Sequence, residues 1–361
     1  MLFITLITLI ICKALLNERL SFNFSYRITS IILLLTAFSN YNTLFNFEIV
    51  TGIGIYNGLF HITYITHIIE IFLLIIGSII LISWPLKNEL ITEISQDSKN
   101  LLYNNGDQNN SNIRYSLLTN NDSNYPINYS IITLFCTLGA SLLISCSDLI
   151  SMYLSIELQS FSLYVLSTLY KNSEKSTSAG LKYFLLGALS SCLILFGAGL
   201  IYAYTGLTNL ESIYSFLSVY SIEINNNLVQ TIYPFLSEAE GYSGSIFLGF
   251  IFIFVGFLFK ISAAPFHNWS PDVYNDTPTI VTIWLTLIPK ISILILLLEL
   301  HMHIDLIDPL SLFGQLELFS FNVDTITKNL LLISSLLSLI IGSVVGLAQN
   351  KIKRLLACQV T

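Results

Sequence analysis

Charged residues are scarce in this chain. Asp, Glu, Lys and Arg make up 10% of its 361 residues, whereas an ordinary soluble domain has about 25%. Hydrophobic residues make up 54%. A chain with so few polar groups cannot cover a water-facing surface, so the composition predicts a membrane protein. The net charge of −7 argues against a nucleic-acid partner.

Motifs for metals, redox groups and nucleotides are also missing. The five cysteines form no C-x-x-C pair, and no Cys/His cluster has the spacing of a zinc or iron–sulfur site. The glycine cluster GIGIYNG, at residues 52–58, lacks the strand–helix context of a phosphate-binding loop. The sequence shows no convincing nucleophile–base constellation. We therefore expect no bound metal and no disulfide framework.

Long apolar runs recur along the chain and predict transmembrane helices of about 20 residues each. The first run lacks the basic n-region of a signal peptide and the Arg/Ser-rich character of a transit peptide, so we expect an uncleaved first helix. A tenth helix begins near Ile352, and the sequence stops at Thr361. The nine predicted helices before it span residues 2–17, 27–46, 66–86, 130–146, 149–170, 178–204, 245–264, 279–300 and 326–349.

The charges of the connections test this count. Lys and Arg occur in the first, third, fifth and ninth connections and are missing from the even-numbered ones. The seventh, residues 265–278, is the exception because it has neither. This alternation follows the positive-inside rule and places the N-terminus outside and the odd-numbered connections inside. The third connection, residues 87–129, is Asn-rich and too polar to bury a core, so we expect an extended loop there.

Four ionisable residues lie within the apolar runs. Inserting each of them into the membrane costs about 2.5–3.5 kcal/mol, so we expect each to have a structural or functional role. Glu157 is well inside the fifth run and is either a structural carboxylate or a functional one. Lys182 lies a few residues into the sixth run, so snorkelling to the surface and a functional role are both open. Lys290 has apolar sequence on both sides, which hinders snorkelling and favours function.

The fourth residue, Lys260, is followed by Pro265, which removes a backbone donor and predicts a break in the seventh helix. A Lys beside a broken helix is typical of an ion path, and the alternative is an ordinary kink near a helix end. His267 is a candidate for bridging water between Lys260 and Lys290. These residues predict a proton relay, because a buried Lys gains or releases a proton as a carboxylate such as Glu157 approaches or recedes.

One stretch has a close family resemblance. The run FKISAAPFHNWSPDVYNDTPTIVTIWLTLIPKISI, at residues 259–293, resembles the subunit 2 family of the proton-pumping NADH dehydrogenase, respiratory complex I, in its mitochondrial form. The P-D-V-Y form at residues 271–274 points to this family rather than to subunits 4 or 5. Residues 148–166, 180–202 and 350–357 are similar to the same family.

The resemblance implies an all-α, polytopic transmembrane helix bundle with an antiporter-like fold, inverted five-helix repeats and a discontinuous seventh helix. It divides the chain into three N-terminal helices (1–86), the Asn-rich matrix loop (87–129), the first repeat (130–300) and the start of the second (301–361). Family members continue after K-R-L-L-A with further helices, so we expect a truncated second repeat.

The resemblance also assigns roles. It implies that Glu157 and Lys260 form a modulating pair, that Lys290 is the central lysine of the path, and that Lys182 is a further one. The chain would translocate protons as a subunit of NADH:ubiquinone reductase in the mitochondrial inner membrane. It would bind no redox cofactor itself and would contact neighbouring antiporter-like subunits, small membrane subunits and lipids. Two alternatives remain open: an Mrp-type cation/proton antiporter and a non-pumping structural scaffold.

Overall fold

The structure, a computed structural model, describes residues 1–16, 22–44, 52–82, 129–170, 173–225, 239–305 and 323–360. The predicted Asn-rich loop at 87–129 therefore lies outside the described residues, except for Tyr129. In chain order the described elements are α1 (Leu2–Leu16), α2 (Phe22–Thr43), β1 (Ile53–Ile55), β2 (Phe60–Ile62), α3 (Tyr64–Ile82), α6 (Tyr129–Ile144), α7 (Leu149–Ser167), α8 (Glu174–Thr205), α9 (Leu210–Asn225), α11 (Ala239–Ile261), α12 (Trp269–Asp276), α13 (Thr279–Asp305), α14 (Val323–Leu347) and α15 (Ile352–Val360).

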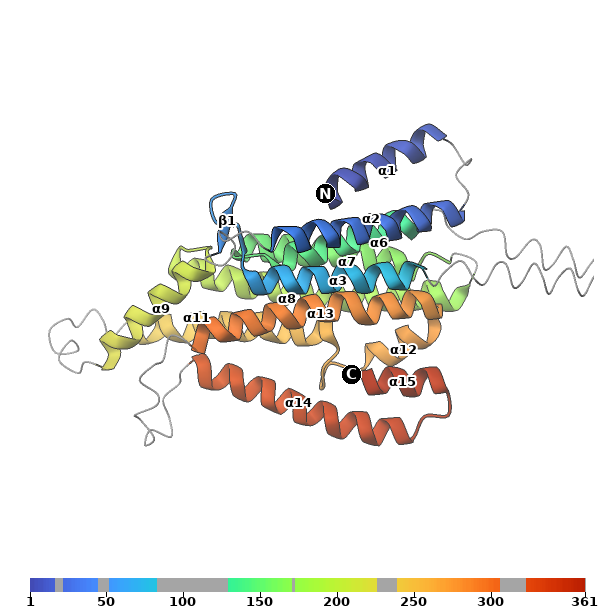
Figure 1. Cartoon of the computed structure of the whole chain (residues 1–361). Helices are drawn as coiled ribbons and strands as arrows, with labels where there is room; N and C mark the ends of the chain where they lie inside the picture. The colour runs from blue at the N-terminus through green and yellow to red at the C-terminus, as the bar shows by residue number, and fades with distance from the viewer. Residues whose placement is uncertain are drawn as a thin grey trace, which may run out of the picture.

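The long helices lie side by side along one common direction, with α1 on one flank and α14 on the other (Figure 1). Within the described ranges, five helices are long and apolar enough to cross a membrane: α3, α7, α8, most of α13 and most of α14. The whole of α6 and parts of α1 and α11 form shorter apolar helices. The prediction of an all-α, polytopic transmembrane bundle is confirmed.

Each of the nine predicted helices is present, with ends shifted by a few residues. The largest differences are at α11, which begins at Ala239 rather than at 245, at α2, which begins at Phe22 rather than at 27, and at α13, which ends at Asp305 rather than at 300. Three small elements were not predicted: the hairpin β1–β2, the helix α9 and the short helix α12. The glycine cluster at residues 52–58 forms the first strand and the turn of this hairpin.

Glycines allow α8 and α11 to pack closely. A Cβ placed on Gly197 would lie 2.5 Å from the carbonyl oxygen of Gly249, and one on Gly249 would lie 2.9 Å from the carbonyl oxygen of Gly197. A Cβ on Gly256 would lie 3.0 Å from the carbonyl oxygen of Ser190. Small residues bring membrane helices into backbone contact in this way. The approach fixes the position of the end of α11, which carries Lys260.

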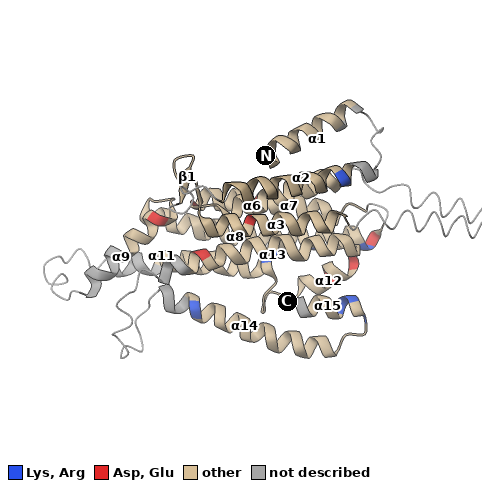
Figure 2. Ribbon diagram, in the orientation of Figure 1, with Lys and Arg blue, Asp and Glu red and all other residues tan. Residues whose placement is uncertain are grey.

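The two ends of the bundle differ. At one end, here called the hairpin end, β1–β2 packs on the corner between α6 and α7: the His61 backbone N–H donates to the Ser145 carbonyl (2.8 Å), and Ser151 Oγ donates to the Leu59 carbonyl (3.0 Å). The other end, here called the basic end, is formed by the start of α8 together with α12 and α15. Figure 2 shows that charges gather near the ends of the helices and that their long middle sections are almost free of them.

Candidate functional site

An ion pair joins α7 to α11 inside the bundle. Glu157 lies in the middle of α7, and Lys260 lies in the last turn of α11. Lys260 Nζ is 3.8 Å from Glu157 Oε1, and the two side chains are 8% and 16% exposed. Both side chains are largely shielded from solvent, so each charge needs the other. The structure thus brings the first two candidate residues together.

A small cavity lies beside this pair. It measures about 20 Å³, and its lining includes Lys260, Gln159, Ser160 and Tyr164. A cavity of about this size with polar walls has room for one water molecule. The pair is too far apart for a direct hydrogen bond, and among the described residues neither Lys260 Nζ nor Glu157 Oε1 has a hydrogen-bond partner. A water molecule in this cavity would lie next to Lys260, whereas Glu157 is not among the lining residues.

The seventh helix is broken, as predicted. α11 ends at Ile261, the next residue Ser262 takes a left-handed backbone conformation (φ 67°), and helical structure resumes in α12 at Trp269. Pro265 lies inside this break. Trp269 Nε1 donates to the Phe259 carbonyl at 3.1 Å and so satisfies a carbonyl near the end of α11. The break places the Ser262 side chain in the interior, where it is fully buried.

Lys290 reaches this break from α13. Its side chain is buried (9% exposed), and Nζ donates to Ser262 Oγ at 3.2 Å. Nζ also lies 5.8 Å from the centre of the Tyr274 ring, a distance at which a cation is attracted to the ring face. The lysine predicted as central thus contacts the residue at which the seventh helix breaks, which argues against an ordinary kink.

Two neutral polar residues that lie near these charged groups in the sequence are hydrogen-bonded to each other. Gln159 Nε2 donates to Ser292 Oγ at 2.9 Å, which ties α7 to α13. Gln159 is two residues from Glu157, and Ser292 is two residues from Lys290. Sequence reasoning missed this pair, although a Gln in an apolar helix beside an intramembrane carboxylate is a usable signal. We call Glu157, Lys260, Gln159, Ser292, Lys290 and Ser262 the polar layer.

Lys182 lies apart from the polar layer. Its side chain is 54% exposed, and Nζ pairs with Asp272 Oδ2 at 3.5 Å at the basic end. Arg354 Nη2 of α15 lies 3.2 Å from the other oxygen of Asp272. Next to it, Lys353 Nζ donates to the Thr277 carbonyl, and burial lowers the pKa of Lys353. The structure therefore places Lys182 in a surface cluster that holds α12 against α8 and α15.

His267 lies in the break between α11 and α12 and is half-buried. Its Nδ1 is buried without a hydrogen-bond partner in the described part of the chain. It is not among the residues that line the cavity beside Lys260. Its suggested role as a water bridge between Lys260 and Lys290 stays a prediction.

These features define a class: a multi-pass membrane protein that keeps paired charges and a broken helix inside its bundle. The family model described as NADH:quinone oxidoreductase/Mrp antiporter, transmembrane, matches residues 146–358. The chain belongs to this family. The match covers all of the polar layer and the broken helix.

Named relatives point to one branch of the family. The chain is 43% identical over 352 residues to NADH-ubiquinone oxidoreductase chain 2 of Rhizopus oryzae, a match that covers 97% of this chain and 58% of that protein. It is 42% identical over 227 residues to the chain 2 of Marchantia polymorpha, covering 63% of this chain and 40% of the relative. The chain thus spans less than two thirds of the length of these relatives.

Solved structures share the fold. Respiratory complex I from Thermus thermophilus contains a chain with a TM-score of 0.65 at 22% identity, covering 100% of this chain and 61% of that one. A chain of the Mrp complex from Dietzia sp. has a TM-score of 0.58 at 14% identity, covering 94% of this chain and 30% of that one. These likenesses support the predicted antiporter-like fold.

Proposed function

We propose that this chain is an antiporter-like subunit of the membrane arm of NADH:ubiquinone reductase and that it translocates protons in the mitochondrial inner membrane. Electron transfer from NADH to ubiquinone takes place elsewhere in that complex, and this chain binds no redox cofactor. Its partners are the neighbouring antiporter-like subunits, small membrane subunits and lipids. The 43% identity to a fungal chain 2 supports this branch over an Mrp-type antiporter, to which the likeness is one of fold.

One observation carries the proposal: α7 and α11 share the buried Glu157–Lys260 pair, and Lys290 of α13 donates to Ser262 at the break that follows α11. A carboxylate 3.8 Å from an amine favours the charged amine, and withdrawing the carboxylate favours release of the proton. A small movement of α7 relative to α11 would thus cause Lys260 to bind or release a proton. The polar layer then supplies Lys290 as the next acceptor, with water as the carrier between them.

The odd-numbered connections are proposed to face the matrix. The basic end of the bundle contains Lys182, Lys353 and Arg354, and excess Lys and Arg mark the inner side of a membrane protein. Lys182 is proposed to serve proton entry at this end, where it is exposed and next to Asp272.

The proposal is tested by replacing Lys290 with Met in the assembled complex and measuring proton translocation driven by NADH oxidation. Lys290→Met removes the titratable group and keeps an unbranched side chain of similar length, so translocation should fall while native electrophoresis still shows a complete complex. Lys175→Gln is the matched control, because Lys175 is an exposed residue near the start of α8. Undiminished translocation in an assembled Lys290→Met complex would favour the structural scaffold instead.

A further inference from the structure

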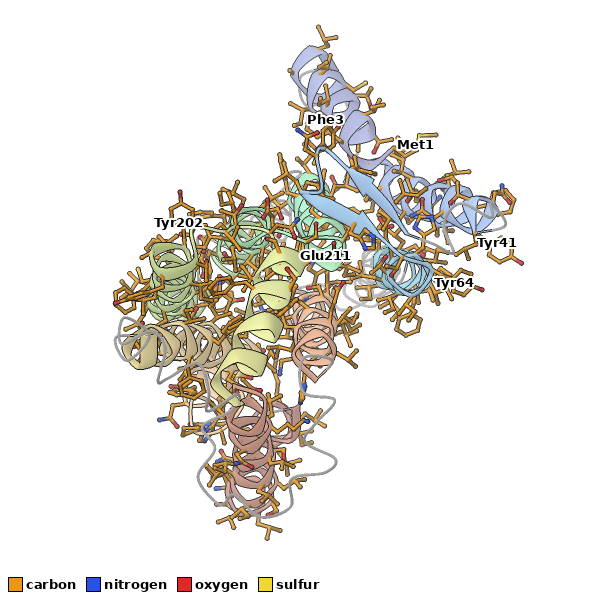
Figure 3. All side chains as sticks on the ribbon, turned by 90° about the vertical axis from the view of Figure 1, so that its left-hand side faces the viewer. Met1, Phe3, Tyr41, Tyr64, Tyr202 and Glu211 are labelled. Carbon is orange, nitrogen blue, oxygen red and sulfur yellow. The ribbon has the colours of Figure 1, made fainter. Side chains whose placement is uncertain are left out.

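A second cavity lies at the hairpin end, remote from the polar layer. It measures about 20 Å³, which is enough for one water molecule. It lies where β2, the α6–α7 corner, α9 and α13 meet. Glu211 is exposed there, and Figure 3 shows it where the hairpin meets α9 at the end of the bundle. The lining residues are His61, Cys146, Ser147, Leu210, Glu211, Tyr214, Leu296, Glu299 and Leu300.

Glu299 of α13 lines this cavity and takes no part in the polar layer. Its Oε2 is buried and has no hydrogen-bond partner within the described residues. A buried carboxyl oxygen without a partner is costly, and such groups are commonly satisfied by a proton, a water molecule or an ion. The cavity next to Glu299 offers that space.

Two titratable groups close to Glu299 are kept neutral. The burial of Tyr214 and the nearness of Glu299 raise the pKa of its hydroxyl, so Tyr214 stays uncharged at neutral pH. Burial, with Glu299 as the second cause, raises the pKa of the Cys146 thiol in the same way. Besides Glu299, the titratable residues that line the cavity are His61 on β2, Cys146 at the α6–α7 corner, and Glu211 and Tyr214 on α9. Asp148 lies two residues after Cys146, and His301 lies two residues after Glu299.

Asp148 and Glu211 add two carboxyl groups to this end of the bundle, and Lys328 lies on α14, a helix that packs against α13. A proton on Glu299 would satisfy its buried Oε2 without a counter-charge. Glu211 is exposed, so the cavity lies next to the surface and its water can exchange with water outside. Towards the interior, the buried apolar residues Leu143, Ile293 and Leu296 belong to one packed cluster with the cavity wall.

We propose that Glu299 is a second proton-exchange site, which binds and releases protons at the hairpin end through this cavity. Its place in a translocation cycle rests on the proposed function, because Lys290 lies nine residues earlier on the same helix, about 14 Å along its axis. The apolar cluster separates the two groups, so a proton crosses between them only when water enters or α13 moves. The binding of a proton by Glu299 does not depend on that cycle.

The test uses the assembled complex and infrared difference spectra recorded as the pH is changed. A protonated carboxyl group gives its own carbonyl band, and we expect one band to be lost in Glu299→Gln and kept in Glu174→Gln, an exposed carboxylate at the opposite end. Tyr214→Phe, which keeps the ring, should shift the same band. Glu299→Asp should keep a carboxyl band at a shifted position. If the Glu299→Gln complex does not assemble, Tyr214→Phe and Glu299→Asp test the assignment instead.

Measurements of proton translocation distinguish a failure of the Glu299 assignment from a failure of the proposed function. Loss of translocation in both Lys290→Met and Glu299→Gln, with the band lost in the latter, is the expected result. Loss in Lys290→Met alone, with the carboxyl band unchanged in Glu299→Gln, overturns the assignment of Glu299 and leaves the proposed function intact. Unchanged translocation in Lys290→Met overturns the proposed function, whereas a carboxyl band that depends on Glu299 would still establish the proton site.

Discussion

Gln159 and Ser292 are neutral side chains of the polar layer that tie α7 to α13. Both are buried, and their hydrogen bond is one of the few side-chain links between α7 and α13 that the structure describes. A hydrogen bond in a dry interior also orients its dipoles with respect to nearby charges. The position of Lys290 relative to Glu157 thus depends on residues that carry no charge.

Replacing this pair tests the link. Gln159→Leu should destabilise the subunit by about 1 kcal/mol, the usual net value of one buried hydrogen bond. Ser292→Ala should cost a similar amount, and the double variant should cost less than the two single changes together, because they remove one interaction. The measurement is the temperature at which the subunit leaves the complex. Strictly additive losses would show that the two side chains do not depend on each other.

The sequence predicted the charged members of the site and missed the neutral ones. Glu157, Lys260 and Lys290 were found because a charge inside an apolar run has a large insertion cost. Gln159 and Ser292 cost much less, and small polar residues are common in membrane helices, so sequence alone does not distinguish them. Glu299 was missed because it lies near the end of its apolar run, where a carboxylate is ordinarily exposed.

At the scale of helices, the close approach of α8 and α11 depends on glycine. Gly249→Ala should destabilise the α8–α11 pair, because the new Cβ would lie 2.8 Å from Ile201 Cγ1 and 2.9 Å from the Gly197 carbonyl oxygen. The expected loss is about 1–3 kcal/mol, as for other overpacked contacts. Because Lys260 lies at the end of α11, proton translocation should fall as well.

Gly199→Ala is the matched control on α8, since a Cβ there meets nothing within 4 Å. This change should leave stability equal or slightly higher, because alanine favours a helix more than glycine does. The amount of assembled subunit after heating distinguishes the two variants. Equal stability of Gly249→Ala and Gly199→Ala would contradict the close helix contact.

Hydrophobic runs and helix breakers identified the long elements but not the short ones. The break at Pro265 was predicted because proline interrupts helical hydrogen bonding. The helix α9, Leu210–Asn225, was missed because its polar residues interrupt the apolar pattern. The hairpin was missed because its strands have three residues each and depend on contacts with the distant corner at residues 145–151.

The seventh connection, which lacks Lys and Arg, is less of an exception in three dimensions. Asp272 lies within it and pairs with Lys182 of α8 and Arg354 of α15. Basic residues from other elements thus surround this connection, in agreement with the alternation along the sequence. Counting charges within each connection could not detect this, because the partners are about 80–90 residues away in the chain.

At the scale of the whole molecule, the proposed orientation has the basic end in the matrix and the hairpin end in the intermembrane space. Single cysteines introduced at Glu174, near the basic end, and at Tyr56, in the hairpin turn, test this orientation because both positions are exposed. A membrane-impermeant maleimide should label Glu174→Cys only in inside-out inner-membrane vesicles and Tyr56→Cys only in mitoplasts. The reverse pattern would invert the orientation and the proposed directions of proton entry and exchange.

The role of the buried ion pair in proton movement is tested by the number of protons translocated per NADH oxidised. The measurement compares Glu157→Gln with Glu174→Gln in the complex reconstituted in vesicles. Glu157→Gln leaves Lys260 without its carboxylate partner, so it can no longer be switched between binding and releasing a proton. The ratio of protons translocated to NADH oxidised is expected to fall in Glu157→Gln and to stay unchanged in Glu174→Gln. An unchanged ratio in a fully assembled Glu157→Gln complex would show that the buried ion pair does not move protons.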